Sequence, residues 1–254
     1  ELARGAHKVI ACAWQPLEEI GSLAQAVGAL FLVDAVTSLA GCPVRVDEWQ
    51  IDACYSGTQK CLSCPPGLSP LTFSPRAVEV LRKRARKVQS WYLDLTMIQA
   101  YWGEERVYHH TAPISMSFAL YEALRLVLEE GLEPRWERHR RNHEALKAGL
   151  DAIGLGIASQ AGHQLWQLNS VSIPAGVDDA AVRRRLLNEF GIEIGAGLGP
   201  LKGKTWRIGL MGESSSAASV FCVLHALERV LPEAGHGVDP GAALSAAQRA
   251  YAQG

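Results

Sequence analysis

The sequence has 254 residues, of which 48% are hydrophobic and 20% charged, and its formal net charge is −1. This composition is that of an ordinary globular protein, and the length suffices for one large domain or two modest ones. A nearly neutral charge argues against nucleic acid or an anionic membrane surface as partner, no apolar run approaches a membrane span, and the first residues do not resemble a signal peptide. The cysteines lie mostly in apolar stretches, which indicates reduced core residues of a cytoplasmic protein: Cys12, Cys42, Cys54, Cys61, Cys64 and Cys222.

The first half of the chain predicts a helix and two buried strands. Apolar residues at helical spacing over Pro16–Ala26 predict the helix. The continuous apolar runs Leu30–Val33 and Ile51–Tyr55 predict strands of a parallel sheet whose two faces are both covered by helices. Asp34 follows the first strand directly, and Lys60 lies on a tight turn after the second.

Asp34 and Lys60 together indicate a particular chemistry. Acids at the carboxyl ends of parallel strands tend to point into a site, although Asp34 could instead cap a helix. A partly buried lysine can be a neutral amine that condenses with an aldehyde, although a lone loop lysine is more often simply solvated. A carboxylate and a lysine that each close an apolar strand suggest a cofactor with a basic ring nitrogen and an aldehyde, which is pyridoxal phosphate.

The middle of the chain predicts an edge strand and three helices. Leu68–Phe73 predicts the strand, and Pro70 indicates that this strand either lies at the edge of the sheet or is interrupted. Ser74-Pro75 predicts the start of a helix that carries the basic run Arg82–Lys87, interpreted as a solvated helix face and not as a nucleic-acid patch. Two further helices are predicted over Pro113–Glu130 and Pro134–Ile153.

Two histidines on the last of these helices have the spacing of a zinc pair. His139 and His143 are four positions apart, but no glutamate general base lies between them. A solvated helix face is therefore the prediction for both, and no metal site is expected.

The last third predicts a small α+β domain, because strands and helices alternate in the order βαββα. Its elements are Asn169–Ile173, Asp178–Phe190, Gly191–Ile194, Thr205–Leu210 and Ser214–Leu231. Beyond Pro232 the composition predicts a loose tail with at most one short helix. The expected division is residues 1–130 for the end of a larger α/β domain, 131–231 for the small domain and 232–254 for the tail.

Four motifs in order resemble the class V aminotransferases, most of all the serine–pyruvate/alanine–glyoxylate group. They are VDAVTSLAG, YSGTQKCLSCPPGLS, YHHTAP and WRIGLMG, and the similarity runs from about Lys8 to about Leu231. The resemblance implies a fold-type I α/β protein, with a mainly parallel sheet in the large domain and an α+β small domain. It also implies that the first third of the family pattern is absent, and that the segment Ala11–Trp14 is shorter than in the family.

The resemblance assigns cofactor roles to four residues near the two predicted strands. Lys60 forms the Schiff base with pyridoxal phosphate, and Asp34 pairs with the ring nitrogen. Val36 lies against the ring face, and Gln59 lies near the phosphate.

The resemblance also assigns Tyr108, Thr111 and Arg207. Tyr108 and Thr111 reach the phosphate of the neighbouring subunit, which implies a homodimer with shared sites. Arg207, between Trp206 and Ile208 on an apolar strand, needs a partner for its charge. That partner is either an internal carboxylate or, by the resemblance, the substrate α-carboxylate.

The expected function is transamination of a small amino acid, alanine or serine, with the 2-oxo acid glyoxylate or pyruvate. Cysteine desulfuration is a rival within the family, but Gln59 occupies the position where those enzymes usually have a histidine. A second rival is a truncated or degenerate homologue without catalysis, which keeps the fold or pairs with a partner chain.

Overall fold

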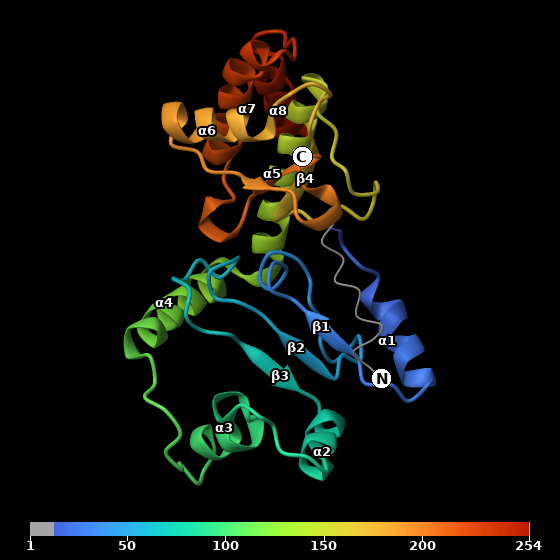
Figure 1. Cartoon of the computed structure of the whole chain (residues 1–254), viewed down its shortest axis with the longest axis vertical. Helices are drawn as coiled ribbons and strands as arrows, with labels where there is room; N and C mark the ends of the chain where they lie inside the picture. The colour runs from blue at the N-terminus through green and yellow to red at the C-terminus, as the bar shows by residue number, and fades with distance from the viewer. Residues whose placement is uncertain (1–12, 254) are drawn as a thin grey trace.

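A computed structural model describes residues 13–253, and it has two parts, each with its own three-stranded sheet (Figure 1). In chain order, the first part contains α1 (Leu17–Ala26), β1 (Leu32–Asp34), β2 (Ala53–Tyr55), β3 (Leu71–Phe73), α2 (Pro75–Lys83), η2 (Trp91–Leu93), α3 (Leu95–Trp102) and α4 (Ile114–Glu130). The second part contains α5 (Leu132–Ala152), β4 (Leu168–Ser172), α6 (Asp179–Phe190), β5 (Gly195–Ala196), η3 (Gly199–Leu201), β6 (Thr205–Gly209), η4 (Gly212–Ser214), α7 (Ala217–Val230), η5 (Pro232–Ala234) and α8 (Ala242–Gln253). Cys12 and the start of the segment Ala11–Trp14 lie outside the described residues.

The first sheet has the order β1-β2-β3 and confirms the predicted strand pairing. Strands β1 and β2 are parallel, with Asp34 opposite Tyr55, and β3 runs antiparallel at the edge. Parallel pairing places the carboxyl ends of β1 and β2 at the same edge of the sheet. The residues that close these two strands therefore become neighbours.

Only one face of this sheet is covered by described residues. Val33 and Cys54 are buried on that face, in a cluster with Ala35 and Ile51. On the opposite face Leu32 is 64% exposed, so the expectation that helices cover both faces is not met within residues 13–253. Along one strand, side chains two positions apart point to the same face of the sheet. Asp34, two residues after Leu32, therefore lies on the open face.

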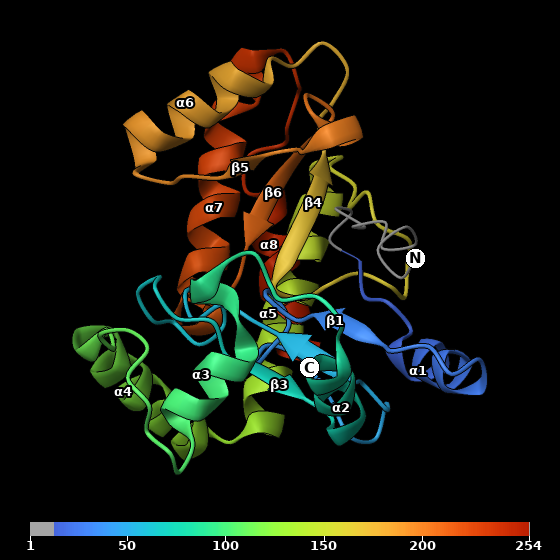
Figure 2. The ribbon, with the colours of Figure 1, turned by 60° about the horizontal axis from the view of Figure 1, so that its bottom comes forward.

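The second part is built around helix α5, which has 21 residues (Figure 2). The sheet order is β4-β6-β5, with antiparallel pairing throughout. Leu146 and Leu150 of α5 pack with Trp206 of β6 and Leu224 of α7 in a cluster of fully buried side chains. Apolar residues of the strands and helices thus face one common core, as the spacing of apolar and polar residues in the sequence predicted.

The C-terminal segment is not a loose tail. After η5 the chain forms α8, whose residues Ala243, Ala246 and Ala247 are buried against α5 and α7. Gly149 on α5 allows this close approach, because a Cβ at that position would lie 3.0 Å from the Ala243 carbonyl oxygen. Alanine side chains are small enough to fit between closely packed helices, so the many alanines of α8 reflect its packing against α5 and α7.

Two element boundaries also differ from the sequence prediction. Helix α2 ends at Lys83, so most of the basic run lies beyond it, and Arg84 forms an ion pair with Asp94 at 2.7 Å. The strand predicted over Gly191–Ile194 forms later, as β5, because only there does the backbone pair with β6.

Helix α4 presents an uncovered apolar stripe. Ile114, Phe118, Tyr121 and Leu128 are all exposed and recur at the spacing of one helix face. Gly131 then joins α4 directly to α5. Its φ is +85°, a backbone conformation that glycine adopts readily.

Within residues 13–253, none of the helices combines the length and the apolar character needed to cross a bilayer.

Candidate active site

The open face of the first sheet carries the Asp34 carboxylate at the end of β1. One carboxylate oxygen, Oδ2, accepts a hydrogen bond from the Tyr55 hydroxyl at 2.8 Å, and Oδ1 accepts one from the Val36 backbone N–H at 2.9 Å. These two bonds fix the direction of the carboxylate. An ionised carboxylate has about four lone-pair positions, so it can still accept from a further group.

Tyr55 is a site residue that the sequence prediction missed. Burial, and then the hydrogen bond to Asp34, raise the pKa of Tyr55 to about 12, so the phenol stays protonated as the donor in this pair. The signal was present in the sequence, because Tyr55 and Asp34 each close a strand of a predicted parallel pair. Recognising that register would have placed the two side chains together.

Lys60 lies on the turn after β2, half-buried, as predicted. Its carbonyl oxygen accepts from the Ser63 N–H at 2.9 Å, and the Cys64 N–H donates to the Thr58 carbonyl oxygen at 3.0 Å. The turn is therefore held by its own backbone. Gln59 folds back over Gly57, where a Cβ would lie 2.8 Å from Gln59 Oε1.

The turns after β1 and β2 are bonded to each other. The Ser56 hydroxyl donates to the Ala35 carbonyl oxygen at 3.0 Å, and the Cys61 thiol donates to the Thr37 carbonyl oxygen at 3.3 Å. Ala35 directly follows Asp34, and Cys61 directly follows Lys60. The structure therefore brings together the two turns that the sequence analysis had paired on chemical grounds.

Arg207 lies on the middle strand of the second sheet and is half-buried. Its neighbours Trp206 and Ile208 point into the core, so Arg207 faces the other side of the sheet. The guanidinium Nε donates to the Ala196 carbonyl oxygen at 2.7 Å, and no described carboxylate pairs with it. Within residues 13–253, the internal salt bridge considered for Arg207 is therefore not formed.

Tyr108 and Thr111 lie on the connection between α3 and α4. Their oxygens are 3.3 Å apart, and both residues are exposed. Between them, His109 is buried, its Nδ1 lies 2.8 Å from the Nδ1 of His110, and its ring stacks on Trp91. Among the described residues, no hydrogen bond joins Tyr108 or Thr111 to the turn of Lys60.

The prediction that His139 and His143 lie on a solvated helix face is wrong. Both side chains are buried on α5, and His143 Nδ1 lies 2.6 Å from Asn169 Oδ1 of β4. The first half of α5 has the polar pattern of an exposed helix because its buried side chains, among them Arg135, His139 and His143, are hydrogen-bonded instead of apolar. The described part of the chain contains no group of three or more His, Cys, Asp or Glu side chains that could hold a metal ion.

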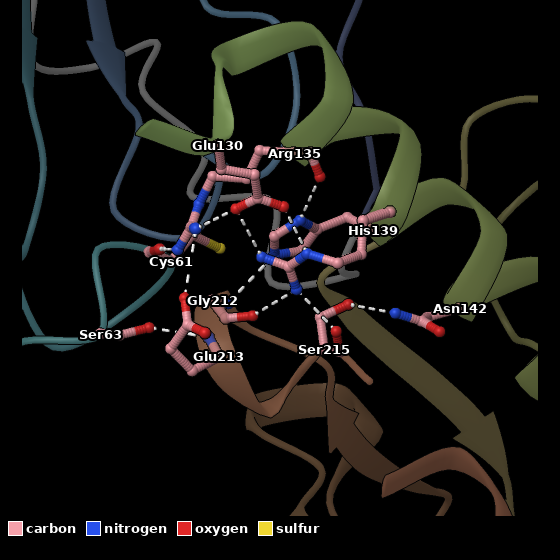
Figure 3. Close-up of polar contacts among 10 residues, drawn as sticks. Cys61, Ser63, Glu130, Arg135, His139, Asn142, Gly212, Glu213 and Ser215 are labelled. Carbon is pink, nitrogen blue, oxygen red and sulfur yellow. Dashed lines mark hydrogen bonds and ion pairs between the residues drawn. The ribbon is translucent and has the colours of Figure 1, made fainter. Parts of the chain in front are cut away.

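His139 belongs to a buried polar cluster that the sequence analysis also missed (Figure 3). We call it the Arg135 network, and its members are the Cys61 carbonyl group, Glu130, Arg135, Arg138, His139, Gly212, Glu213 and Ser215. The network joins the first two turns of α5 to the turn of Lys60 and to the segment after β6. Its partners are 73 to 78 positions from α5 in the sequence, apart from Glu130, so periodicity could not reveal them.

His139 is neutral in this cluster, with a defined tautomer. The Gly212 N–H donates to His139 Nε2 at 3.0 Å, and His139 Nδ1 lies 2.7 Å from the Arg135 carbonyl oxygen. Nε2 is therefore the unprotonated nitrogen, and Nδ1 carries the hydrogen. Burial, and then the positive charges of Arg138 and Arg135, lower the pKa of His139 to about 4.

Comparison with known families gives one match that spans most of the chain. The family model described as Aminotransferase class-V matches residues 6–209. The (S)-ureidoglycine–glyoxylate transaminase of Bacillus subtilis is 44% identical, over 93% of this chain and 61% of that protein. The alanine–glyoxylate aminotransferase of Callithrix jacchus is 40% identical, over 85% of this chain and 53% of that protein.

Solved structures agree with these sequence matches. The crystal structure of the Bacillus subtilis ureidoglycine–glyoxylate aminotransferase superposes with a TM-score of 0.92 and 46% identity, covering 96% of this chain and 63% of that one. An alanine–glyoxylate aminotransferase from Nostoc sp. superposes with a TM-score of 0.86 and 52% identity, covering 89% and 60% of the two chains. The present chain thus spans roughly three fifths of the length of these relatives.

Proposed function

Because this chain belongs to the class V aminotransferase family, we propose that it transfers an amino group from a small amino acid to a 2-oxo acid. The observation that carries this proposal is the pair Asp34 and Lys60, which lie on hydrogen-bonded turns at the ends of two parallel strands. The acceptor is glyoxylate or pyruvate, and glyoxylate has the support of the relatives' names. The donor is alanine or serine, with (S)-ureidoglycine as a second candidate because the Bacillus subtilis relative is named for it.

The family and fold imply pyridoxal phosphate as the cofactor, and the residues present fit it. The fold is that of the fold-type I enzymes, of which the chain contains part. The Asp34 carboxylate lies on an open sheet face and has unused acceptor positions toward a protonated ring nitrogen. Lys60 Nζ forms no hydrogen bond or ion pair with any residue from 13 to 253, so its amine is available.

We propose these roles for the chain's own residues. Lys60 would hold the cofactor covalently through its side-chain amine. Once the substrate has displaced this amine, the amine would take the proton from the substrate Cα and deliver it to the cofactor carbon. Asp34, aimed by the Tyr55 hydroxyl, would keep the ring nitrogen protonated. When bound, the cofactor supplies an aldehyde and an electron-withdrawing ring. Val36 would lie against that ring, and Gln59 near the phosphate.

Arg207 is proposed to bind the substrate α-carboxylate. A guanidinium fork matches a carboxylate with two parallel hydrogen bonds. Nε is occupied by the Ala196 carbonyl oxygen, which fixes the plane of the group. The terminal nitrogens are not hydrogen-bonded to described residues and are the donors that a substrate would meet.

We further propose a homodimer in which Tyr108 and Thr111 serve the cofactor phosphate of the neighbouring subunit. Both hydroxyls are exposed and lie close together, so they can act on a group outside their own chain. The apolar stripe of α4, defined above, supplies the kind of surface that obligate interfaces bury.

Four cysteines are buried and unpaired among the described residues, which supports a reducing compartment and hence a cytoplasmic location.

The test of the proposed function is covalent trapping at Lys60. The protein, with any residues that its gene encodes ahead of Glu1, is incubated with pyridoxal phosphate, reduced with borohydride and mapped by mass spectrometry. We expect the pyridoxyl label on Lys60 and its loss in Lys60→Ala. The matched control is Lys147→Ala, because Lys147 is, like Lys60, a half-buried lysine, but it lies on α5 and pairs with Asp151. A label elsewhere, or none at all, would favour the rival of a non-catalytic homologue.

A second measurement separates transamination from desulfuration. Protein that is loaded with pyridoxal phosphate but not reduced is assayed with alanine, serine, (S)-ureidoglycine and cysteine as donors. The acceptor is glyoxylate or, for donors other than alanine, pyruvate. Transamination gives equal amounts of new amino acid and new 2-oxo acid. Formation of alanine from cysteine without a 2-oxo acid, with sulfide released when a thiol reductant is added, would instead support the desulfuration rival.

A further inference from the structure

Helix α5 contacts both segments on which the proposed chemistry depends. Its first two turns contact the turn that carries Lys60 and the segment that follows Arg207 on β6 (Figure 3). These two segments come from the two sheets of the molecule. Helix α5 is therefore placed where it can set the position of one relative to the other.

Arg135 makes the contact with the lysine turn. Its side chain is 2% exposed, and one terminal nitrogen donates to the Cys61 carbonyl oxygen at 2.9 Å. The other terminal nitrogen donates to Glu130 and, at 3.2 Å, to Glu213 Oε1. The acceptor Cys61 is the residue directly after Lys60, and Glu213 lies six positions beyond Arg207. One guanidinium thus bridges the lysine turn and the segment that follows the Arg207 strand.

Arg138 and His139 make the contacts with the segment after β6. Arg138 donates to the Gly212 carbonyl oxygen at 2.8 Å and to the Ser215 carbonyl oxygen at 2.6 Å. His139 accepts from the Gly212 N–H at 3.0 Å. A glycine is required there, because φ is +56° and a Cβ would lie 1.9 Å from Ser63 Oγ.

The two segments also touch each other directly. The Glu213 N–H donates to Ser63 Oγ at 2.9 Å, across 150 positions of sequence. Glu130 accepts hydrogen bonds from both Arg135 and Arg138. The two bonds from Arg138 are 2.6 Å and 3.0 Å long. Because the guanidinium groups are planar and their donors fixed in direction, these shared bonds restrict sliding of one segment past the other.

We propose that Arg135 is a positioning residue for the transamination site, acting through the Cys61 carbonyl oxygen and Glu213 to hold the Lys60 turn in register with the Arg207 strand. The inference rests on the proposed roles of Lys60 and Arg207. It goes beyond them because Arg135 is bonded to Glu130, Glu213 and the Cys61 carbonyl oxygen and has no proposed role in binding substrate or cofactor. A displacement of about 1 Å between two reacting groups can lower a rate by about a hundredfold, so a register of this kind affects the chemical step more than ligand affinity.

The first test measures the register without any activity. Hydrogen–deuterium exchange is followed in the peptides that contain Thr58–Cys64 and Met211–Ser216, with β4 as the internal reference. In Arg135→Met we expect exchange at least tenfold faster in both peptides together, with β4 unchanged. The matched control is Arg140→Met, since Arg140 on the same helix pairs with Glu137 at 2.7 Å and with no other residue in the described range 13–253. Faster exchange in all three regions, or in one peptide alone, would overturn the proposal.

The second test separates kcat from KM in the complete enzyme. Arg135→Met should lower kcat ten- to a hundredfold, change KM less than threefold and keep the borohydride label on Lys60 at the parental stoichiometry. Arg135→Lys should recover part of kcat, because it keeps the charge but offers one nitrogen in place of the fork. Arg140→Met should match the parent. A folded, fully labelled Arg135→Met protein with kcat within twofold of the parent would overturn the proposal.

A further variant keeps the proposal testable if Arg135→Met does not fold. Ser63→Ala removes only the acceptor of the Glu213 N–H, at an exposed position where water can replace it. We expect a fall in kcat of about threefold with label and KM retained, and the same two peptides to exchange faster. If neither peptide changes in Ser63→Ala and in Arg135→Lys, the register does not depend on these bonds. Failure of the proposed function is a different result, since the parent would then carry no label on Lys60.

Discussion

Arg207 is the residue whose role depends most on the geometry of its side chain. Arg207→Lys keeps the charge but loses the fork, so substrate binding should weaken by about 1.5–3 kcal/mol while cofactor binding remains. Apparent KM values for the amino acid and the 2-oxo acid would measure the loss, with label stoichiometry on Lys60 as the control. Unchanged KM values for both substrates would make Arg207 a structural residue held by the Ala196 carbonyl oxygen.

His139 should make the stability of the fold depend on pH. Burial, and then the charges of Arg138 and Arg135, lower its pKa from 6.5 to about 4 in the folded chain. Between these values the unfolded chain binds a proton that the folded chain does not, so the unfolding free energy should fall as pH drops from about 6.5 to about 4. Glu130 and Glu213 face the same cluster and accept hydrogen bonds from Arg135. Hydrogen bonds from Arg138 and then from Arg135 lower the pKa of Glu130.

The measurement for His139 is urea unfolding at several pH values in the parent and in His139→Gln, which cannot titrate. The parent should lose at most roughly 3 kcal/mol more than the variant over this range, the free energy that corresponds to the shift. Burial also lowers the pKa of His143, so a residual slope remains in the variant. An identical slope in both proteins would show that His139 is not held neutral by the fold.

At the residue scale, the sequence predicted the groups that close strands and missed the groups that bridge segments. Asp34 and Lys60 could be found because an apolar run followed by a polar residue is a local signal, and the structure places their turns together. Arg135 and His139 could not be found, because their backbone partners, the Cys61 carbonyl oxygen and the Gly212 N–H, are more than 70 positions away. Charged residues on a helix give the same local pattern whether they face water or a distant carbonyl group.

Helix α8 is the element whose packing the sequence did not reveal, and it gives a direct test. Ala247 is fully buried, so Ala247→Asp would place an unpaired charge in the interior between α5, α7 and α8. The unfolding free energy should fall by about 3–5 kcal/mol. Ala252→Asp, at an exposed position of the same helix, should change it by less than about 0.5 kcal/mol. Equal effects in urea unfolding would mean that α8 is not part of the folded core.

The elements that were predicted well share one property. Strands β1 and β2 are short continuous apolar runs, and helices α4 to α7 carry apolar residues at helical spacing. Each of these elements therefore indicated its own type and nearly its own limits. Strand β5 was misplaced because its extent depends on pairing with β6, and α8 because its buried face consists of alanine. The sequence did not predict the open face of the first sheet. A continuous apolar run indicates that both faces of a strand are covered, but it does not indicate which residues cover them.

At the scale of the whole molecule, shared sites predict recovery of activity between two inactive chains. One chain carries Lys60→Ala, and the other carries Tyr108→Phe with Thr111→Ala. Each mixed dimer then has one intact site. Since random pairing makes half of the dimers mixed, about a quarter of the parental activity should return. The mixture is refolded together in the form that carries any residues encoded ahead of Glu1.

The matched control for complementation is a mixture of Lys60→Ala with Arg207→Ala. In the proposed arrangement both residues act within the same chain, so every site in this mixture has a defect and no activity should return. Recovery in this control, or none in the first mixture although mixed dimers are present, would contradict the shared site. Native mass spectrometry of tagged chains would establish that mixed dimers have formed.

The bond between Glu213 and Ser63 also has a consequence for how the protein is made. The two residues are 150 positions apart, so at about 5–20 residues per second a ribosome needs about 8 to 30 s between them. Throughout that interval the Lys60 turn exists without Gly212, Glu213 and Ser215. We expect nascent chains that are stalled before Met211 to expose the Lys60 turn to protease, and chains stalled well beyond α7 to protect it. The register of the active site would then be completed only after α7 has left the ribosome, and the cofactor would meet an organised lysine only from that point on.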